Sequence, residues 1–382
     1  MKQVGGGSRS VTGMGGRAER PRLAFVLPDL RGGGAERVAL TLIKDFDARG
    51  YQIDLLLLDA RGELLPLLPP AVRVIDLKST RIRNAVAAIA SYLREAKPDG
   101  IQVSMWSLTI AGIVAHRISR SSARLVVSDH TTLSKHYGDA GWFRRKVMGW
   151  TIRLFYPLAD ARIVVAQAAA EDLADLSGLP RDLFEVVHNP VYPPQLEASP
   201  VVDVDRLWGG SGPRILNVGQ LKPEKNQKLL LEAFAQMSGD ARLIILGEGE
   251  LRDELEAYAA TLGVADRVIM PGFVIDPTPF YRSANLFVLS SDYEGFGLVL
   301  VEAMRSGLPV VSTDCASGPA EILADGRFGR LTPCGDADRL VAAMLDELAA
   351  PTDAERLKAR AEELSGEHIA DRYLELMDSG WR

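Results

Sequence analysis

The sequence has few of the features that would place a protein outside the cell or across a membrane. Its two cysteines, Cys315 and Cys334, cannot build a disulfide framework or, by themselves, a zinc site, so we expect reduced thiols in a cytoplasmic protein. Apolar runs are short, and even residues 53–58 cannot span a bilayer. Residues 1–20 are rich in Gly, Ser and Arg without an apolar stretch, which predicts a flexible leader and not a signal peptide.

Sequence motifs typical of metal-binding and nucleic-acid-binding proteins are also missing. His116, His136 and His368 do not stand at metal-ligand spacings, and we identify no carboxylate cluster of the kind that holds a nucleotide-bound metal. The net charge is −6 and no recognition motif is present, which disfavours a nucleic-acid partner. We therefore expect no metal cofactor and no nucleic acid.

What is present is ordinary globular composition, with 47% hydrophobic and 25% charged residues. A chain of 382 residues suits two α/β domains. Residues 1–190 carry 26 Lys and Arg against 19 Asp and Glu, whereas residues 191–382 carry 18 against 31. A basic first half beside an acidic second half fits two domains with different partners, although drift of surface charge would give the same pattern.

Short β-rich runs alternate with amphipathic helical patterns, which predicts an α/β fold of two Rossmann-like, doubly wound domains facing a cleft. A stretch rich in Pro and Gly interrupts the pattern and marks a domain boundary. We place the domains at residues 21–192 and 213–360, a linker at 193–212, and a C-terminal helix at 361–382 that is expected to pack back on the first domain. Strands are predicted at residues 23–27, 53–58, 72–76, 100–104, 124–128, 161–165, 184–187, 214–218, 242–246, 268–270, 286–289 and 310–313.

Three consecutive glycines, Gly32, Gly33 and Gly34, follow the first predicted strand and open a helix. Glycines let the backbone approach a ligand closely, and the free N–H groups of a helix N-terminus favour a phosphate. The G-x-G-x-x-G spacing of a dinucleotide-binding loop is not present, which disfavours a dehydrogenase. A plain strand–helix turn is the alternative, but such a turn does not need three glycines.

The second half repeats this arrangement in a loop that contains Lys225, which is placed to reach a phosphate, although a lone lysine in a loop is usually solvated. A more specific motif follows, in which Glu294 and Glu302 flank Gly295 and Gly297 at the predicted start of a helix. The glycines leave backbone N–H groups open, and carboxylates are natural acceptors for vicinal hydroxyls. The pattern indicates a site for a sugar and a diphosphate.

These motifs, in this order, resemble those of glycosyltransferase family 4, which has the GT-B fold. The resemblance runs from about residue 23 to the C-terminus and rests on the Gly-rich loop, the VGQLKPEKN run at residues 218–226 and the E-x7-E motif. Residues 312–323 resemble a branch that makes lipopolysaccharide, capsules and lipid-linked oligosaccharides from UDP-linked hexoses or N-acetylhexosamines. The first domain would then take the acceptor and the second the nucleotide sugar.

The resemblance also implies roles for individual residues. Lys225 would bind the donor diphosphate, Glu294 the donor sugar and Glu302 the ribose, and His130 matches the family's histidine near the reacting sugar. It implies a nucleotide-sugar donor, a glycan or lipid-linked acceptor, transfer with retention, and no metal. The implied catalytic residues are His130 and Glu294, and the implied donor site comprises Gly33, Gly34, Gln220, Lys225, Glu294, Gly295, Phe296, Gly297, Leu298 and Glu302.

The sequence departs from the family at two places. Gln220 stands where members usually carry Arg, and a neutral amide cannot replace a guanidinium on a diphosphate. Lys222 would compensate, or donor affinity is lower, or the donor is unusual. A catalytically silent sugar-nucleotide-binding subunit and a sugar-nucleotide epimerase of the same fold remain the alternatives. Gln167 stands where Ser often follows the strand, so the next helix is expected to lack a side-chain cap.

Two further features carry expectations. His130 follows the end of a predicted strand and is therefore expected to face the cleft, whereas His188, near the hinge, is expected to have a structural role.

Residues 141–159 contain four cations, no acid and several aromatic residues, which is typical of a helix at an anionic membrane surface, although core helices share the pattern. We expect a cytoplasmic protein with peripheral contact at the inner face of the membrane through this segment.

Overall fold

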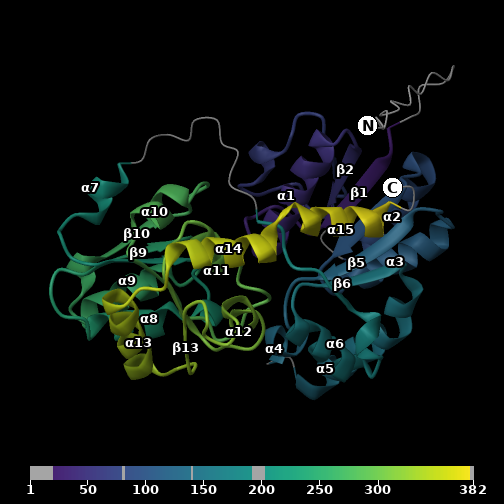
Figure 1. Ribbon diagram of the computed structural model, residues 1–382. Coiled ribbons are helices and arrows are strands. Elements are labelled where there is room, and N and C mark those ends of the chain that lie inside the picture. The colour runs from purple at the N-terminus through teal and green to yellow at the C-terminus, as the bar shows by residue number, and fades with distance from the viewer. Residues whose placement is uncertain (1–19, 80–81, 139–140, 192–202, 379–382) are drawn as a thin grey trace, which may run out of the picture.

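A computed structural model describes residues 20–79, 82–138, 141–191 and 203–378. The expected leader, apart from residue 20, and the first half of the expected linker lie outside these ranges. Within them the chain forms two α/β domains, each built around a parallel sheet (Figure 1).

The first sheet has seven strands in the order β3-β2-β1-β4-β5-β6-β7. Its central strands are buried on both faces, because helices cover the sheet from both sides, and this explains their nearly continuous apolar sequences. The strands are β1 (Arg22–Leu27), β2 (Gln52–Leu57), β3 (Arg73–Asp76), β4 (Gly100–Ser104), β5 (Arg124–Asp129), β6 (Ala161–Val164) and β7 (Glu185–Val186). The helices of this domain are α1 (Gly34–Ala48), α2 (Ile82–Ala96), α3 (Leu108–Ser119), α4 (Leu133–His136), α5 (Gly141–Phe155) and α6 (Gln167–Ser177).

The second sheet has six strands in the order β10-β9-β8-β11-β12-β13. In both sheets the order reverses beside the first strand, and ligands bind at such switch points, outside the carboxyl ends of the strands. The strands are β8 (Arg214–Val218), β9 (Arg242–Leu246), β10 (Val268–Gly272), β11 (Leu286–Leu289), β12 (Val310–Thr313) and β13 (Arg330–Thr332). The helices are α7 (Val204–Trp208), α8 (Gln227–Ala235), α9 (Arg252–Thr261), α10 (Thr278–Ser283), α11 (Leu298–Arg305), α12 (Pro319–Leu323), α13 (Ala337–Ala349), α14 (Ala354–Ser365) and α15 (Glu367–Met377).

The last two helices cross from one domain to the other (Figure 1). Helix α14 packs on α11 of the second domain, and α15 packs on α1, β4 and β5 of the first. Arg124 on β5 donates a hydrogen bond from Nε to the carbonyl oxygen of Leu376 at 2.7 Å, and Tyr373 is fully buried. None of the helices in the described ranges is both long and apolar enough to cross a bilayer.

Every strand predicted from the sequence is found within two residues of its expected limits, and β13 is an addition. The predicted fold of two doubly wound domains is therefore confirmed.

Candidate functional site

Glu294 lies at the centre of the candidate site, in the loop between β11 and α11. It is only 7% exposed, and its Oε1 accepts hydrogen bonds from Lys225 Nζ at 2.6 Å and from Ser291 Oγ at 2.7 Å. Lys225 lies in the loop between β8 and α8, 69 residues earlier in the chain. The two loops singled out in the second domain therefore meet around one buried carboxylate, at the carboxyl edge of the second sheet.

The segment Glu294 to Gly297, which we call the donor loop, touches the first domain. A Cβ at Gly295 would lie 1.7 Å from the carbonyl oxygen of His130, so only glycine permits this approach. Thr132 Oγ1 donates a hydrogen bond to the carbonyl oxygen of Glu294 at 3.4 Å. Gly297, with a φ of +96°, is the N-cap of α11 and adopts this conformation without the strain of a side chain.

The Gly-rich loop of the first domain faces the same place. Gly33 is the N-cap of α1 and Gly34 its first residue, and a Cβ at Gly34 would lie 3.6 Å from the side chain of Leu298. Neither α1 nor α11 has a side-chain cap at its N-terminus. The N-terminus of α11 can therefore offer backbone N–H groups to an anion between the domains, whereas in the first turn of α1 the buried Glu36 carboxylate accepts a hydrogen bond from its own backbone N–H.

Glu302 lies further along α11 and is half-buried. Its Oε2 accepts a hydrogen bond from the Tyr281 hydroxyl at 2.8 Å. Burial raises the pKa of Glu302, while the charge of Arg37 and the Tyr281 hydroxyl oppose this rise. Arg37, Tyr281, Leu298 and Glu302 line a cavity of about 580 Å³ between α1 and helices α10 and α11, a volume typical of small-molecule sites.

Gln220 follows β8, and its carbonyl oxygen accepts a hydrogen bond from Gln227 Nε2 at 3.0 Å. Its side-chain amide has no hydrogen-bond partner among the residues that the structure describes. Two residues later, Lys222 acts electrostatically on the first domain: burial raises the pKa of Glu36 and the charge of Lys222 opposes this rise. Lys222 and Lys225 are therefore the cations that this loop brings toward the domain interface.

His130 follows β5 and lies against the donor loop. Burial lowers the pKa of His130 to about 4, and the neighbouring Asn189 amide opposes this only in part, so the ring is neutral near pH 7. Its Nε2 lies 3.2 Å from Ser128 Oγ, whereas its buried Nδ1 has no hydrogen-bond partner among the described residues. A neutral imidazole has one N–H donor and one acceptor nitrogen, so it can bond a hydroxyl of a ligand that reaches the ring.

Asp129, beside His130, is also buried. Burial raises the pKa of Asp129 to about 6, although the Tyr156 hydroxyl donates a hydrogen bond to its Oδ2 at 2.6 Å and a backbone N–H also favours the charged form. Burial thus favours the neutral form of both neighbouring groups, because it raises the pKa of Asp129 and lowers that of His130.

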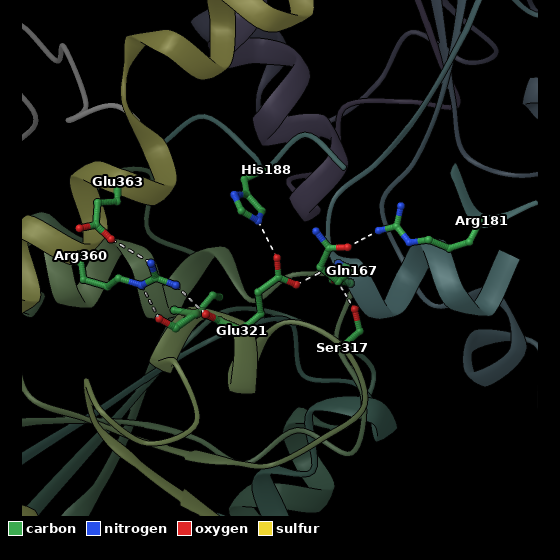
Figure 2. A network of polar contacts seen from close by, with 9 residues as sticks. Gln167, Arg181, His188, Ser317, Glu321, Arg360 and Glu363 are labelled. Atoms are coloured by element: carbon green, nitrogen blue, oxygen red, sulfur yellow. Dashed lines mark hydrogen bonds and ion pairs between the residues drawn. The ribbon is translucent and has the colours of Figure 1, made fainter. Parts of the chain in front are cut away.

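Sequence reasoning missed one link across the domain boundary. Glu321 on α12 accepts hydrogen bonds from His188 Nε2 at 2.7 Å and from the backbone N–H of Gln167 at 2.9 Å (Figure 2). The His188 ring stacks on Phe296 of the donor loop, with 5.1 Å between centroids. The missing helix cap at Gln167 was the only sequence signal that pointed to this contact.

The structure thus brings the predicted glycines, Lys225, Glu294, Glu302 and His130 together at the domain interface, and their roles toward a ligand remain predictions. Within the described ranges no three His, Cys, Asp or Glu side chains lie close enough to hold a metal ion. Of three Asp-x-Asp sequences, the first has Asp45 paired with Arg49, and in the other two Asp203 caps α7 and Asp336 caps α13.

Two family models match the chain side by side. The model described as Glycosyltransferase Family 4 matches residues 32–193, and that described as Glycosyl transferases group 1 matches residues 205–364. Together they cover both domains.

Two curated relatives illustrate matches over most of both chains. The N-acetylgalactosamine-N,N'-diacetylbacillosaminyl-diphospho-undecaprenol 4-alpha-N-acetylgalactosaminyltransferase of Campylobacter jejuni is 28% identical over 323 residues, which cover 81% of this chain and 85% of that protein. The amylovoran biosynthesis glycosyltransferase AmsD of Erwinia amylovora is 27% identical over 353 residues, 91% of this chain and 95% of AmsD.

Among solved structures, Anabaena HepE in complex with UDP and glucose superposes with a TM-score of 0.79 at 23% identity, over 93% of this chain and 99% of HepE. WaaG, a glycosyltransferase involved in lipopolysaccharide biosynthesis, superposes with a TM-score of 0.73 at 19% identity, over 94% of this chain and all of WaaG. These likenesses establish the fold. With both family models matched in tandem on a fold of two Rossmann-like domains, the chain belongs to the glycosyltransferases of the family 4 type, with the GT-B fold.

Proposed function

We propose that this glycosyltransferase moves a hexose or N-acetylhexosamine from a UDP-linked donor to a glycan or polyprenyl-linked acceptor, with retention of configuration and without a metal ion. The name of the Campylobacter relative includes both a diphospho-undecaprenol acceptor and an N-acetylgalactosaminyl group, which supports these classes of acceptor and sugar. The structural neighbour that binds UDP and glucose motivates the choice of donor.

The observation that carries the proposal is the buried Glu294 carboxylate, held by Lys225 at 2.6 Å in a loop that touches His130 of the other domain. A carboxylate can accept hydrogen bonds from two sugar hydroxyls. The uncapped N-terminus of α11 and the Lys225 ammonium supply positive charge for a diphosphate beside it. Sugar and leaving group would thus be held at one place between the domains.

The proposed mechanism assigns a step to each of these groups. The acceptor hydroxyl attacks the anomeric carbon from the face that the diphosphate leaves, so one C–O bond breaks as another forms and configuration is retained. The departing phosphate oxygen takes the acceptor proton, and Lys225 with the helix N–H groups stabilises its negative charge. His130 is neutral and can stay beside a carbon that develops positive charge without repelling it.

The proposal is tested by incubating the protein with a panel of nucleotide sugars and membrane lipid extract, with EDTA present, and measuring nucleoside diphosphate release. We expect release from one UDP sugar, dependent on lipid and unaffected by EDTA. Nucleotide binding without release from any donor would favour the silent subunit, and donor conversion without acceptor would favour an epimerase.

Gln220→Arg is expected to strengthen donor binding. A guanidinium at this position would add a bidentate, charge-assisted contact to the diphosphate, so the Kd for UDP should fall roughly tenfold. Isothermal titration with UDP measures this, and Gln220→Met is the matched uncharged control. An unchanged or weaker affinity in the Arg variant would show that this position does not face the diphosphate.

We also propose that α5 binds an anionic membrane surface. Trp142, Phe143 and Trp150 are 70%, 68% and 64% exposed, whereas Met148 and Ile152 on the opposite face are buried. With 3.6 residues per turn, the exposed apolar residues form one outward stripe and the buried ones face the domain. Cations but no acids occur in residues 141–159, and an apolar stripe beside cations suits anionic headgroups.

Replacing both Trp142 and Trp150 by Ser should weaken binding to vesicles that contain phosphatidylglycerol by roughly 10- to 100-fold, because two aromatic anchors are lost. Co-sedimentation with vesicles measures the loss. Leu345→Ser, which removes a residue 49% exposed on α13 of the second domain, is the control that should bind as the wild type does. Equal sedimentation of all three proteins would exclude α5 as the contact.

A further inference from the structure

One carboxylate of the second domain holds two groups of the first. Glu321 lies on α12, and Figure 2 shows its side chain between His188 and Gln167. Oε1 accepts a hydrogen bond from His188 Nε2 at 2.7 Å, and Oε2 accepts one from the backbone N–H of Gln167 at 2.9 Å. An ionised carboxylate can only accept, so Nε2 of His188 carries the proton in this contact.

The contact with Gln167 supplies a cap that helix α6 lacks. Its N-cap residue is Ala166, which has no side-chain oxygen, and no other side chain takes that place within the first domain. A carboxylate at a helix N-terminus satisfies a free N–H group and interacts favourably with the helix dipole. The first turn of α6 is therefore completed only when the second domain lies against it.

The contact with His188 leads to the donor loop. The His188 ring stacks on Phe296, with an angle of 23° between the planes and 5.1 Å between centroids. Phe296 is 2% exposed and lies between Gly295, which touches His130, and Gly297, which caps α11. Glu321 thus fixes the ring against which the donor loop packs.

Glu321 is itself held firmly. Arg360 on α14 donates hydrogen bonds to the carbonyl oxygens of Glu321 at 2.8 Å and Ile322 at 3.1 Å, at the end of α12. Burial alone would raise the pKa of Glu321, but the hydrogen bonds from His188 and the Gln167 N–H, with the charge of Arg360, outweigh it and lower the pKa. The carboxylate is therefore charged at neutral pH, and its backbone is anchored to the helix that leads across to the first domain.

We infer that Glu321 is a positioning residue that sets the two domains, and with them the donor loop and His130, in the arrangement required for transfer. Its side chain bonds His188 and Gln167 and makes no hydrogen bond to Lys225, Glu294 or Glu302. Without it, α6 loses its cap, His188 loses its partner, and the second domain loses its polar attachment at this point of the boundary. A test of this inference by kcat rests on the proposed function, whereas tests by hydrogen–deuterium exchange and small-angle scattering do not.

Glu321→Ala is expected to separate binding from turnover. The Kd for UDP should stay within about twofold of wild type, since the candidate nucleotide residues lie elsewhere, while kcat should fall roughly 10- to 100-fold because the reacting groups are misplaced. Hydrogen–deuterium exchange should become faster in peptides that cover the start of α6. Small-angle scattering with UDP bound should give a larger radius of gyration than the wild type.

Two further variants separate positioning from simple stability. Glu363→Gln removes an acid that pairs with Arg360 at 2.9 Å on the exposed side of the same cluster, and it should leave kcat, exchange and scattering unchanged. Ala166→Ser, added to Glu321→Ala, gives α6 a cap of its own. We expect this double variant to recover slow exchange in α6 but not kcat.

Recovery of kcat by Ala166→Ser would overturn the inference, because Glu321 would then act only as a helix cap. Wild-type kcat and scattering in Glu321→Ala would overturn it equally. If the wild type itself transfers no sugar, the proposed function fails, but exchange and scattering still decide whether Glu321 holds the domains together.

Discussion

Replacing Glu294 by Gln is expected to lower kcat/KM for the donor sugar about 10³-fold, with little change in the Kd for UDP. The carboxylate is buried and can accept hydrogen bonds from two sugar hydroxyls, whereas an amide has only one acceptor oxygen and no charge; a loss of about 10³-fold corresponds to about 4 kcal/mol of transition-state stabilisation. The amide would keep the size of the side chain but would leave the Lys225 ammonium without a counter-charge. Steady-state kinetics with the donor found in the panel measure the loss.

The matched control is Glu254→Gln. Glu254 also pairs with a lysine, Lys228, but this pair lies on the exposed surface of the second domain. Exposed pairs contribute about 0–1 kcal/mol, so activity and stability should both stay close to wild type. A near-normal kcat/KM in Glu294→Gln would show that Glu294 does not contact the donor sugar. If UDP binding were lost together with activity, the substitution would have disrupted the loop and not only a sugar contact.

The strands of both sheets could be predicted because almost every strand has a recognisable pattern in its own residues and in those that flank it. The strand β1 lies between a proline and the Gly-rich loop, and β8 likewise lies between a proline and the loop that contains Lys225. The exception is β13, which has three residues, too few to show any periodicity. Its place is set by pairing with β12, a tertiary contact that a local pattern does not encode.

The site residues that belong to sequence motifs could be predicted, whereas the contacts between them could not. Glu294 and Glu302 lie on one loop and helix, and the resemblance supplied their roles, but no spacing in the sequence shows that Lys225 reaches Glu294. The link between Glu321 and His188 joins residues 133 positions apart and depends on how two domains meet. Only the uncapped start of α6 indicated that a partner was missing there.

Stability should depend on pH through two neighbouring groups that act in opposite directions. Burial raises the pKa of Asp129 to about 6, above its value of about 4 in an unfolded chain, so its contribution to stability is present at low pH and is lost as the pH rises from about 4 to 6. Burial lowers the pKa of His130 to about 4, below its unfolded value of about 6.5. Its contribution is present above that value and is lost as the pH falls from about 6.5 to 4.

In the wild type these two contributions to the unfolding free energy largely cancel between pH 7 and pH 5. A single substitution at either residue should make the contribution of the other measurable. Relative to wild type, Asp129→Asn should lose about 1–2 kcal/mol of unfolding free energy over this fall in pH, because only the histidine term remains. His130→Asn should gain a similar amount, because only the aspartate term remains. Urea unfolding at pH 5, 6 and 7 measures the three curves, and the double variant should follow the wild type because both terms are gone. Parallel curves for the two single variants would show that neither group has a shifted pKa in the folded protein.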